Sequence, residues 1–300
     1  MKILISGASG LVGTHLIPTL KAKGHSVFKL VRKTAKLSDE INWDAEKGFV
    51  ESEQAKLEGF DAVIHLAGEN IGEGSWTEER KKRLRDSRVV GTRVLVDGLK
   101  KTQSPPKIFI SASAEGIYGD GKDEVLTEDS PKGEGFLAEL CDAWEVESQK
   151  ATEFGARVVN LRIGLVLSKE GGALSKMLTP FKLAVGGAFG SGKQWMSWIT
   201  LEDLIRIIHF VLENENVSGA INSTAPNPVT NQEFTKTLGK VVHRPTFFTV
   251  PEFAIKLIFG EMGENLLLRG TRVLPKRLQD LGFTFEFTNL EDALKHILEN

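Results

Sequence analysis

Three glycines near the start of the chain have the spacing that a phosphate-binding turn requires. The apolar run Lys2–Ser6 predicts a buried strand, and a helical pattern occupies Thr14–Ala22. Between them, G-x-x-G-x-x-G lets the backbone turn tightly, approach a pyrophosphate and pack helix on strand. The N–H groups at the start of the helix would point at the anion. The residues of this predicted dinucleotide site are Gly7, Ser9, Gly10, Leu11, Val12 and Gly13.

Two cations after the expected second strand, Val27–Val31, indicate which dinucleotide binds. NAD(H) sites usually have an Asp or Glu here, which accepts a hydrogen bond from the ribose 2′-OH. This chain has Arg32 and Lys33 instead, and an arginine can bind a 2′-phosphate through two parallel hydrogen bonds. We therefore expect NADP(H) in preference to NAD(H). The alternative is that both cations are simply solvated.

Further candidate cofactor contacts lie at the ends of later strands or on neighbouring helices. They are Leu66, Ala67, Gly68, Ser111, Arg88 and Arg162. The first three follow an apolar strand, where a backbone can approach the cofactor. The two arginines could bind a phosphate or a substrate carboxylate. The alternatives are a local hydrogen bond for the serine and a helix-surface position for Arg88.

These side chains need strands that alternate with helices. Apolar runs at Ala62–Leu66, Ile108–Ser111 and Arg157–Leu167 are separated by helical stretches, which is typical of a parallel sheet covered on both faces. Right-handed crossovers then give a Rossmann-type, doubly wound α/β fold. We expect residues 1–165 to form the dinucleotide-binding domain, to which 197–225 return. Residues 166–300 would form a smaller substrate lobe, with a helical domain at 250–300.

The motifs resemble those of the extended short-chain dehydrogenase/reductase superfamily. They are Gly7–Gly13, His65–Gly68 and the Ile117-Tyr118-Gly119 element. Ala67–Ile71, Phe136–Cys141, Leu161–Leu167 and Val273–Leu278 are similar to its atypical "epimerase family" branch. That resemblance implies nucleotide binding and a C-terminal domain of unknown function at about 250–300. The substrate of this branch is generally unassigned.

The resemblance also implies a Tyr-x-x-x-Lys acid/base pair, which this chain lacks. Its one tyrosine, Tyr118, is followed four residues later by Lys122, but the intervening glycines predict a turn rather than a helix. In the expected helix Glu134–Gln149, the corresponding positions fall on Phe136 or Leu137 and on Leu140 or Cys141. The usual hydroxyl residue is replaced by Ala114. The family's proton transfer therefore cannot be carried over to these residues.

Other side chains could replace the missing pair. Candidates for acid/base or polarising roles are Ser113, Glu69, Tyr118 and Glu115. Their alternatives are backbone hydrogen bonding, a solvated carboxylate and structural packing. Two functions stay open: an NADP(H)-dependent oxidoreductase or epimerase-like enzyme acting on an unidentified small molecule, and a non-catalytic NADP(H)-binding regulatory or interaction protein.

Composition limits the partners, the metal sites and the cellular compartment that we expect. The formal net charge is −2 and there is no long apolar run, so we expect no nucleic-acid or membrane partner. The single cysteine, Cys141, is typical of a reducing compartment, and we expect a cytoplasmic protein with this cysteine as a small buried group. The six histidines show no metal-ligand spacing, so no metal is expected. A homodimer stays open.

Four apolar residues between the expected strand Arg157–Leu167 and residue 204 suggest the character of the substrate pocket. They are Met177, Phe181, Trp195 and Trp198. If they line a lid, they favour a hydrophobic or aromatic substrate. The alternative is that they are ordinary core residues.

Overall fold

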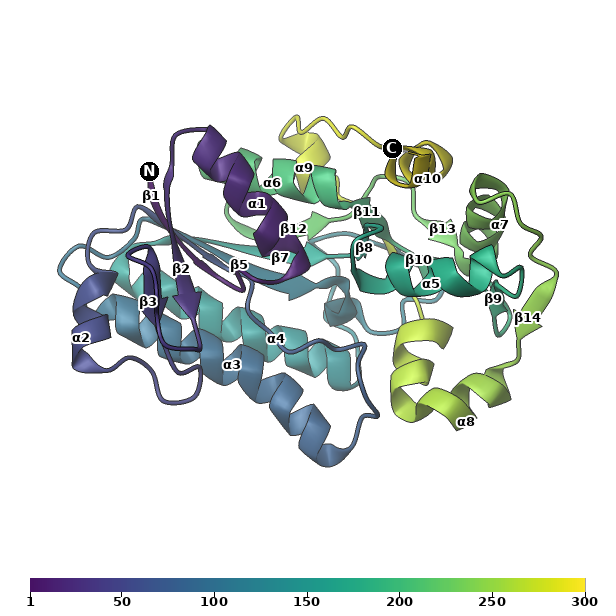
Figure 1. Ribbon diagram of the computed structural model, residues 1–300, viewed down its shortest axis with the longest axis horizontal. Coiled ribbons are helices and arrows are strands. Elements are labelled where there is room, and N and C mark those ends of the chain that lie inside the picture. The colour runs from purple at the N-terminus through teal and green to yellow at the C-terminus, as the bar shows by residue number, and fades with distance from the viewer. Residues whose placement is uncertain (300) are drawn as a thin grey trace.

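A computed structural model describes residues 1–299 (Figure 1). Its centre is a seven-stranded parallel sheet with helices on both faces. The strands are β1 (Lys2–Ser6), β2 (Ser26–Val31), β3 (Glu40–Asn42), β4 (Ala62–His65), β5 (Ile108–Ala114), β7 (Arg157–Ile163) and β12 (Gly219–Ser223), in the spatial order β12-β7-β5-β4-β1-β2-β3. The surrounding helical segments are α1 (Leu11–Ala22), α2 (Glu51–Gln54), η1 (Ala55–Leu57), α3 (Glu78–Lys100), η2 (Glu115–Tyr118), α4 (Phe136–Gln149), η3 (Lys150–Phe154) and α6 (Leu201–Glu213).

The sheet is parallel because its strands are apolar on both sides. Along β1, Ile3 and Ile5 pack in a core with α1 and α6, whereas Leu4 packs in a second core with α3. On β5, Ile110 packs in the first of these cores and Phe109 in the second. Strands buried on both faces need helical crossovers, which confirms the predicted Rossmann-type doubly wound class.

The remaining elements form a smaller lobe of short strand pairs and helices. They are β6 (Val125–Leu126), β8 (Leu165–Leu167), α5 (Gly172–Lys182), β9 (Gly187–Phe189), β10 (Trp195–Met196), β11 (Trp198–Thr200), β13 (Val229–Thr230), α7 (Asn231–Val241), β14 (Phe248–Val250), α8 (Glu252–Gly263), η4 (Glu264–Leu268), β15 (Arg272–Val273), α9 (Lys276–Asp280) and α10 (Leu290–Glu299). β15 pairs with β6, which follows β5 and η2 in the chain. The C-terminal segment therefore reaches the carboxyl end of β5. No helix within residues 1–299 is long and apolar enough to cross a membrane.

The sequence expectation for one strand is wrong in detail. The run Arg157–Leu167 is two strands, because at Gly164 the chain leaves the main sheet and β8 pairs with β11. A Cβ on Gly164 would lie 2.4 Å from the Ser197 carbonyl oxygen, so the two backbones can cross here only at a glycine. α3 begins after its N-cap residue Thr77, whose hydroxyl accepts a hydrogen bond from the Arg80 amide.

Asp203, at the start of α6, fixes the last part of the chain. It is 1% exposed, and its carboxylate accepts hydrogen bonds from the backbone amides of Glu286 at 2.9 Å and Phe287 at 3.0 Å. It also forms a 2.6 Å ion pair with Arg206. One buried carboxylate thus joins the helix that covers the sheet to the segment before α10.

Asp203→Ala should lower the free energy of unfolding by about 3 kcal/mol, because the backbone amides of Glu286 and Phe287 and the Arg206 guanidinium lose their shared, buried acceptor. Urea denaturation followed by circular dichroism would measure the change. Lys236→Ala, at an exposed position on α7, is the control and should change stability by less than about 0.5 kcal/mol. Equal effects of the two substitutions would contradict this role of Asp203.

Candidate functional site

The glycine turn between β1 and α1 has the close backbone approaches expected of a phosphate cradle. A Cβ on Gly7 would lie 2.7 Å from the Leu66 carbonyl carbon, and one on Gly13 would lie 2.4 Å from the Gly7 carbonyl oxygen. Gly7 has φ +72°, which glycine adopts without strain. The structure therefore brings the turn and the Leu66–Gly68 segment together, as the predicted cofactor site requires.

The N-terminus of α1 is open to an anion. Gly10 is its N-cap residue, no side chain caps it, and its first turn has no acidic residue. Within the described residues, the first amides of α1 are therefore available to a phosphate. This arrangement fits a dinucleotide pyrophosphate, and the amides of Leu11 and Val12 would hold it.

Arg32 and Lys33 follow β2 at the same edge of the sheet. Both side chains are exposed, and neither forms an ion pair with any residue from 1 to 299. The two carboxylates nearby, Asp39 and Glu40, are paired with Lys29 instead. The cations are thus free to meet a phosphate, which fits a 2′-phosphate better than a bare ribose hydroxyl.

Arg88 lies next to the glycine segment and is held from three directions. Its guanidinium donates to the carbonyl oxygens of Glu69 at 2.9 Å and Leu84 at 3.1 Å, and lies 5.2 Å from the Trp144 ring. A Cβ on Gly68 would lie 3.1 Å from the Arg88 Cζ atom. Burial lowers the pKa of this guanidinium. Arg88 therefore supports the loop expected to approach the cofactor, whereas its predicted contact with a ligand stays a prediction.

Arg162 belongs to a partly buried network of protein side chains. Its Nε and Nη2 atoms donate to the two carboxylate oxygens of Glu145 at 2.9 and 3.0 Å. Its Nη1 atom donates to the Tyr118 hydroxyl at 2.9 Å. That hydroxyl in turn donates to Asn222 at 2.7 Å, and burial raises the pKa of Tyr118. This geometry favours a structural role for Arg162 and Tyr118.

The other acid/base candidates are similarly engaged. Ser113 donates to Glu145 at 2.7 Å, and the fully buried Ser111 donates to the carbonyl of Ala112. The Glu69 carboxylate forms an ion pair with Arg80. Each of these side chains thus has a hydrogen-bond or ion-pair partner within the protein, which favours a structural role over a catalytic one.

Glu115 differs from these groups because its carboxyl has no cation beside it. The residue follows β5 directly, and Thr271 from the C-terminal segment donates to its Oε2 atom at 3.1 Å. Burial raises the pKa of Glu115 to about 8, although hydrogen bonds from Thr271 and Ser197 oppose the shift. This pKa favours the protonated form of Glu115 at pH 7, and the residue lies at the edge of the sheet where the predicted cofactor contacts lie.

The positions of α4 where the resemblance places a Tyr–Lys pair hold apolar side chains. Cys141 on α4 packs with Ile117 and Tyr118, and burial raises the pKa of its thiol to about 12. Phe136 contacts Trp76 edge to face, with ring centroids 5.2 Å apart.

His65, at the end of β4, is fully buried. Its ring forms hydrogen bonds with Ser6 and Thr92, and burial lowers its pKa to about 4. His65 is thus a neutral core residue, as expected.

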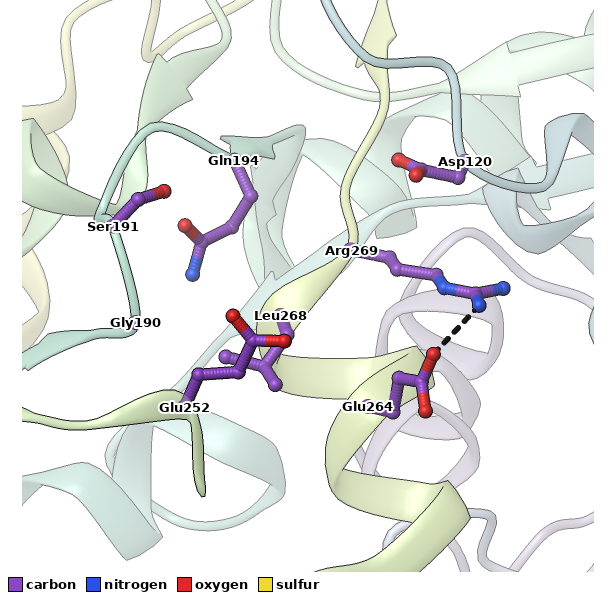
Figure 2. A pocket seen from close by; sticks show the side chains of 8 residues that line it. All are labelled: Asp120, Gly190, Ser191, Gln194, Glu252, Glu264, Leu268 and Arg269. Atoms are coloured by element: carbon purple, nitrogen blue, oxygen red, sulfur yellow. Dashed lines mark hydrogen bonds and ion pairs between the residues drawn. The ribbon is translucent and has the colours of Figure 1, made fainter. Parts of the chain in front are cut away.

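A cleft that the sequence did not reveal lies beyond η2. It measures about 310 Å³ and is bordered by the 190–194 loop, the α8–η4 segment and the residue after Gly119 (Figure 2). Its lining residues are Asp120, Gly190, Ser191, Gln194, Glu252, Glu264, Leu268 and Arg269. Arg269 pairs with Glu264 at 2.8 Å. These residues are distant in sequence and mostly polar, so no motif connects them before folding.

The aromatic lid is not formed as expected. Trp198 is fully buried and donates to the Asn227 carbonyl, and Phe181 is buried in the same core of the smaller lobe. Only Trp195 and Met177 keep partial exposure. Trp198 and Phe181 thus fill the core of the smaller lobe, whose short strands provide little apolar area of their own. Within residues 1–299, no group of three side chains could hold a metal ion.

Comparisons with known proteins show which family the chain resembles. A protein-family model described as "NAD dependent epimerase/dehydratase family" matches residues 3–222, and a second family model, described as "Domain of unknown function (DUF1731)", matches residues 250–297. The epimerase family protein ML0860 of Mycobacterium leprae is 40% identical over 98% of this chain and 94% of its own.

Two solved structures are similar over the whole chain. The human epimerase family protein SDR39U1 (isoform 2), solved with NADPH, has a TM-score of 0.90 and 35% identity, and the match covers 100% of both chains. A protein described as a nucleoside-diphosphate sugar epimerase from Corynebacterium glutamicum has a TM-score of 0.81 and 34% identity, over 99% of this chain and 58% of that one.

Glu115 should make stability depend on pH. Its pKa is higher in the folded than in the unfolded chain, so its contribution is complete below about pH 4.5 and is lost as the pH rises through about 8. The total loss is on the order of 5 kcal/mol. Glu115→Gln should remove this dependence, so that its stability relative to wild type increases between pH 6 and 9. Urea denaturation at several pH values would measure it. A constant difference between the two proteins would contradict a buried neutral Glu115.

Proposed function

This chain belongs to the NAD dependent epimerase/dehydratase family, and we propose that it binds NADP(H) to oxidise, reduce or epimerise a small molecule. The observation that carries the cofactor is the pair of exposed, unpaired cations Arg32 and Lys33, beside an open helix N-terminus. NADPH in the similar human structure supports the same choice. When bound, this cofactor supplies or accepts a hydride.

The substrate would bind in the cleft beyond η2. A lining with Ser191, Gln194, Arg269 and three carboxylates suits a hydrophilic molecule with several hydrogen-bonding groups. This replaces the hydrophobic or aromatic substrate suggested by the sequence, because Trp198 and Phe181 are core residues. The α8–η4 segment of the C-terminal domain would position the substrate.

Glu115 is the best candidate for the proton transfer that the Tyr–Lys pair usually performs. A pKa of about 8 lets the carboxyl hold a proton at neutral pH and release it with little cost. The Thr271 hydroxyl, which donates to Oε2, would orient this carboxyl. Ser113, Glu69 and Tyr118 are weaker candidates, since Glu69 is paired with a cation and the two hydroxyls are bound to the Glu145–Arg162 ion pair.

Because the other candidate side chains are bound to partners within the protein, a function without catalysis is also supported. If Glu115 serves only to join the C-terminal segment to β5, the chain would bind NADP(H) without catalysis and act as a regulatory or interaction protein. The two functions share the cofactor site and differ only in the chemistry at the end of β5.

Cofactor preference can be measured directly. NADPH should bind at least tenfold more tightly than NADH, and Arg32→Glu should weaken NADPH binding at least tenfold, about 1.4 kcal/mol, while changing NADH binding less than about threefold. Nicotinamide fluorescence titration gives both dissociation constants. Lys101→Glu, which makes the same charge change at the far end of α3, is the control. Equal affinity of wild type for the two dinucleotides would remove the role of Arg32.

Catalysis can be tested by a screen of polar carbonyl and hydroxyl compounds that follows NADPH formation or oxidation. With any substrate found, Glu115→Gln should lower kcat by about 100-fold or more and leave NADPH affinity unchanged. Thr271→Val should shift the pH profile of kcat instead of abolishing activity, because it removes a hydrogen bond that lowers the pKa of Glu115. A screen without any turnover, with NADPH binding intact, would favour the non-catalytic function.

A further inference from the structure

An unusually apolar surface covers β14 and α8, away from the cofactor contacts. Phe247 is 89% exposed, Phe253 73%, Leu257 84% and Ile258 65%. Phe248 is also exposed, as are two residues after α5, Leu183 and Val185. We call these seven residues the apolar surface. Single exposed apolar residues are ordinary, but seven in two short segments mark an interaction site.

The fold places the two segments side by side. β14 pairs in parallel with β9, and the register sets Phe248 opposite Gly187. Phe247 directly precedes β14, and Val185 lies two positions before the first residue of β9. α8 begins directly after β14, with Pro251 as its N-cap residue. Within the described residues β14 has one strand neighbour, β9, so its other edge is unpaired.

Charge limits what could cover this surface. Between residues 247 and 259 the charged side chains are Glu252 and Lys256, which pair with each other at 2.7 Å. A nucleic acid or an anionic membrane would need a group of unpaired cations here. A neutral apolar surface with an open strand edge is instead complementary to itself.

The size of the surface also suits a second copy. At about 200 Å² for a whole phenylalanine side chain, the three phenylalanines alone leave roughly 400 Å² accessible. The leucines, isoleucine and valine add a similar area. The total approaches the ~800 Å² per partner of a standard stable interface.

We propose that the apolar surface is the contact of a homodimer, in which β14 and α8 of two copies pack about a two-fold axis. A two-fold axis brings the same patch of each copy together, so every residue of the surface is buried twice in one interface. The charged outer face of α3, rich in lysine and arginine, offers no comparable surface. This inference is independent of the proposed function, because no residue of the apolar surface belongs to the cofactor contacts.

Sedimentation velocity from 1 to 100 μM would test the dimer. Wild type should reach twice the chain mass of 33.0 kDa within this range. Leu257→Glu and Phe253→Glu should each weaken dimerisation at least 100-fold, because each charge enters the interface twice. Val146→Glu, at a 54% exposed position on α4, is the matched control and should leave the dimer intact. NADPH binding by all variants, unchanged, would confirm that they fold.

Cross-linking adds a measurement that does not depend on weakening the contact. The one native cysteine is buried, so Ile258→Cys places a single exposed thiol on α8. Oxidation should yield covalent dimers that Val146→Cys does not form. A wild-type monomer at 100 μM, or dimers unaffected by Leu257→Glu, would overturn the proposal. Flotation with vesicles of phosphatidylcholine and phosphatidylglycerol would also overturn it if monomeric wild type bound them and Leu257→Glu did not.

Discussion

The ion pair between Glu145 and Arg162 holds together the parts of the structure that meet at the candidate site. Arg162 lies on β7 and Glu145 on α4, and both oxygens of the carboxylate accept from the guanidinium. Through Tyr118 and Asn222, the pair extends to η2 and to β12. A largely desolvated pair of this kind contributes little when compared with apolar residues of the same shape, but the loss of one partner leaves an uncompensated charge. The carboxyl edge of the sheet can therefore keep this form only with both charges present.

This network also explains why Ser113 and Tyr118 are poor replacements for the Tyr–Lys pair that the chain lacks. Ser113 and Tyr118 are the side chains nearest in type to the family's hydroxyl and tyrosine, and both are bound to members of the ion-pair network. Their hydrogen bonds position β5 and η2. Proton transfer would then need a group outside the network. Glu115 is such a group, since its partner Thr271 comes from the C-terminal segment instead.

The sequence predicted those parts of the fold that depend on local patterns. The glycine turn, the strand at Ala62–His65 and the neutral core role of His65 follow from residue type and spacing over a few positions. Short or broken strands could not be predicted in this way. β12 has only one large apolar residue, Ile221, and is a strand because β7 provides its partner. The break at Gly164 depends on Ser197, which is 33 positions away in the sequence.

Long-range pairing also limited the prediction of the site. We predicted that Arg162 contacts a ligand, because a cation at the end of a strand is typical of such a site. Its actual partner, Glu145, lies in a helix, and no sequence pattern connects the two residues. The cleft has the same origin, since its lining joins residue 120 to the 190–194 loop and to residues 252–269.

α8 connects the cleft to the apolar surface. Glu252 lines the cleft, while the next residue, Phe253, is 73% exposed, because successive residues on a helix point about 100° apart. Farther along, Gly260 departs from helical geometry with φ +55°, and Glu261 pairs with Lys81 of α3 at 3.1 Å. The helix is thus anchored at one end to the dinucleotide-binding half and at the other to β14. A second copy packed on Phe253 and Leu257 would restrict the same helix that borders the cleft. Dimerisation and substrate access would therefore depend on a single element of the C-terminal domain.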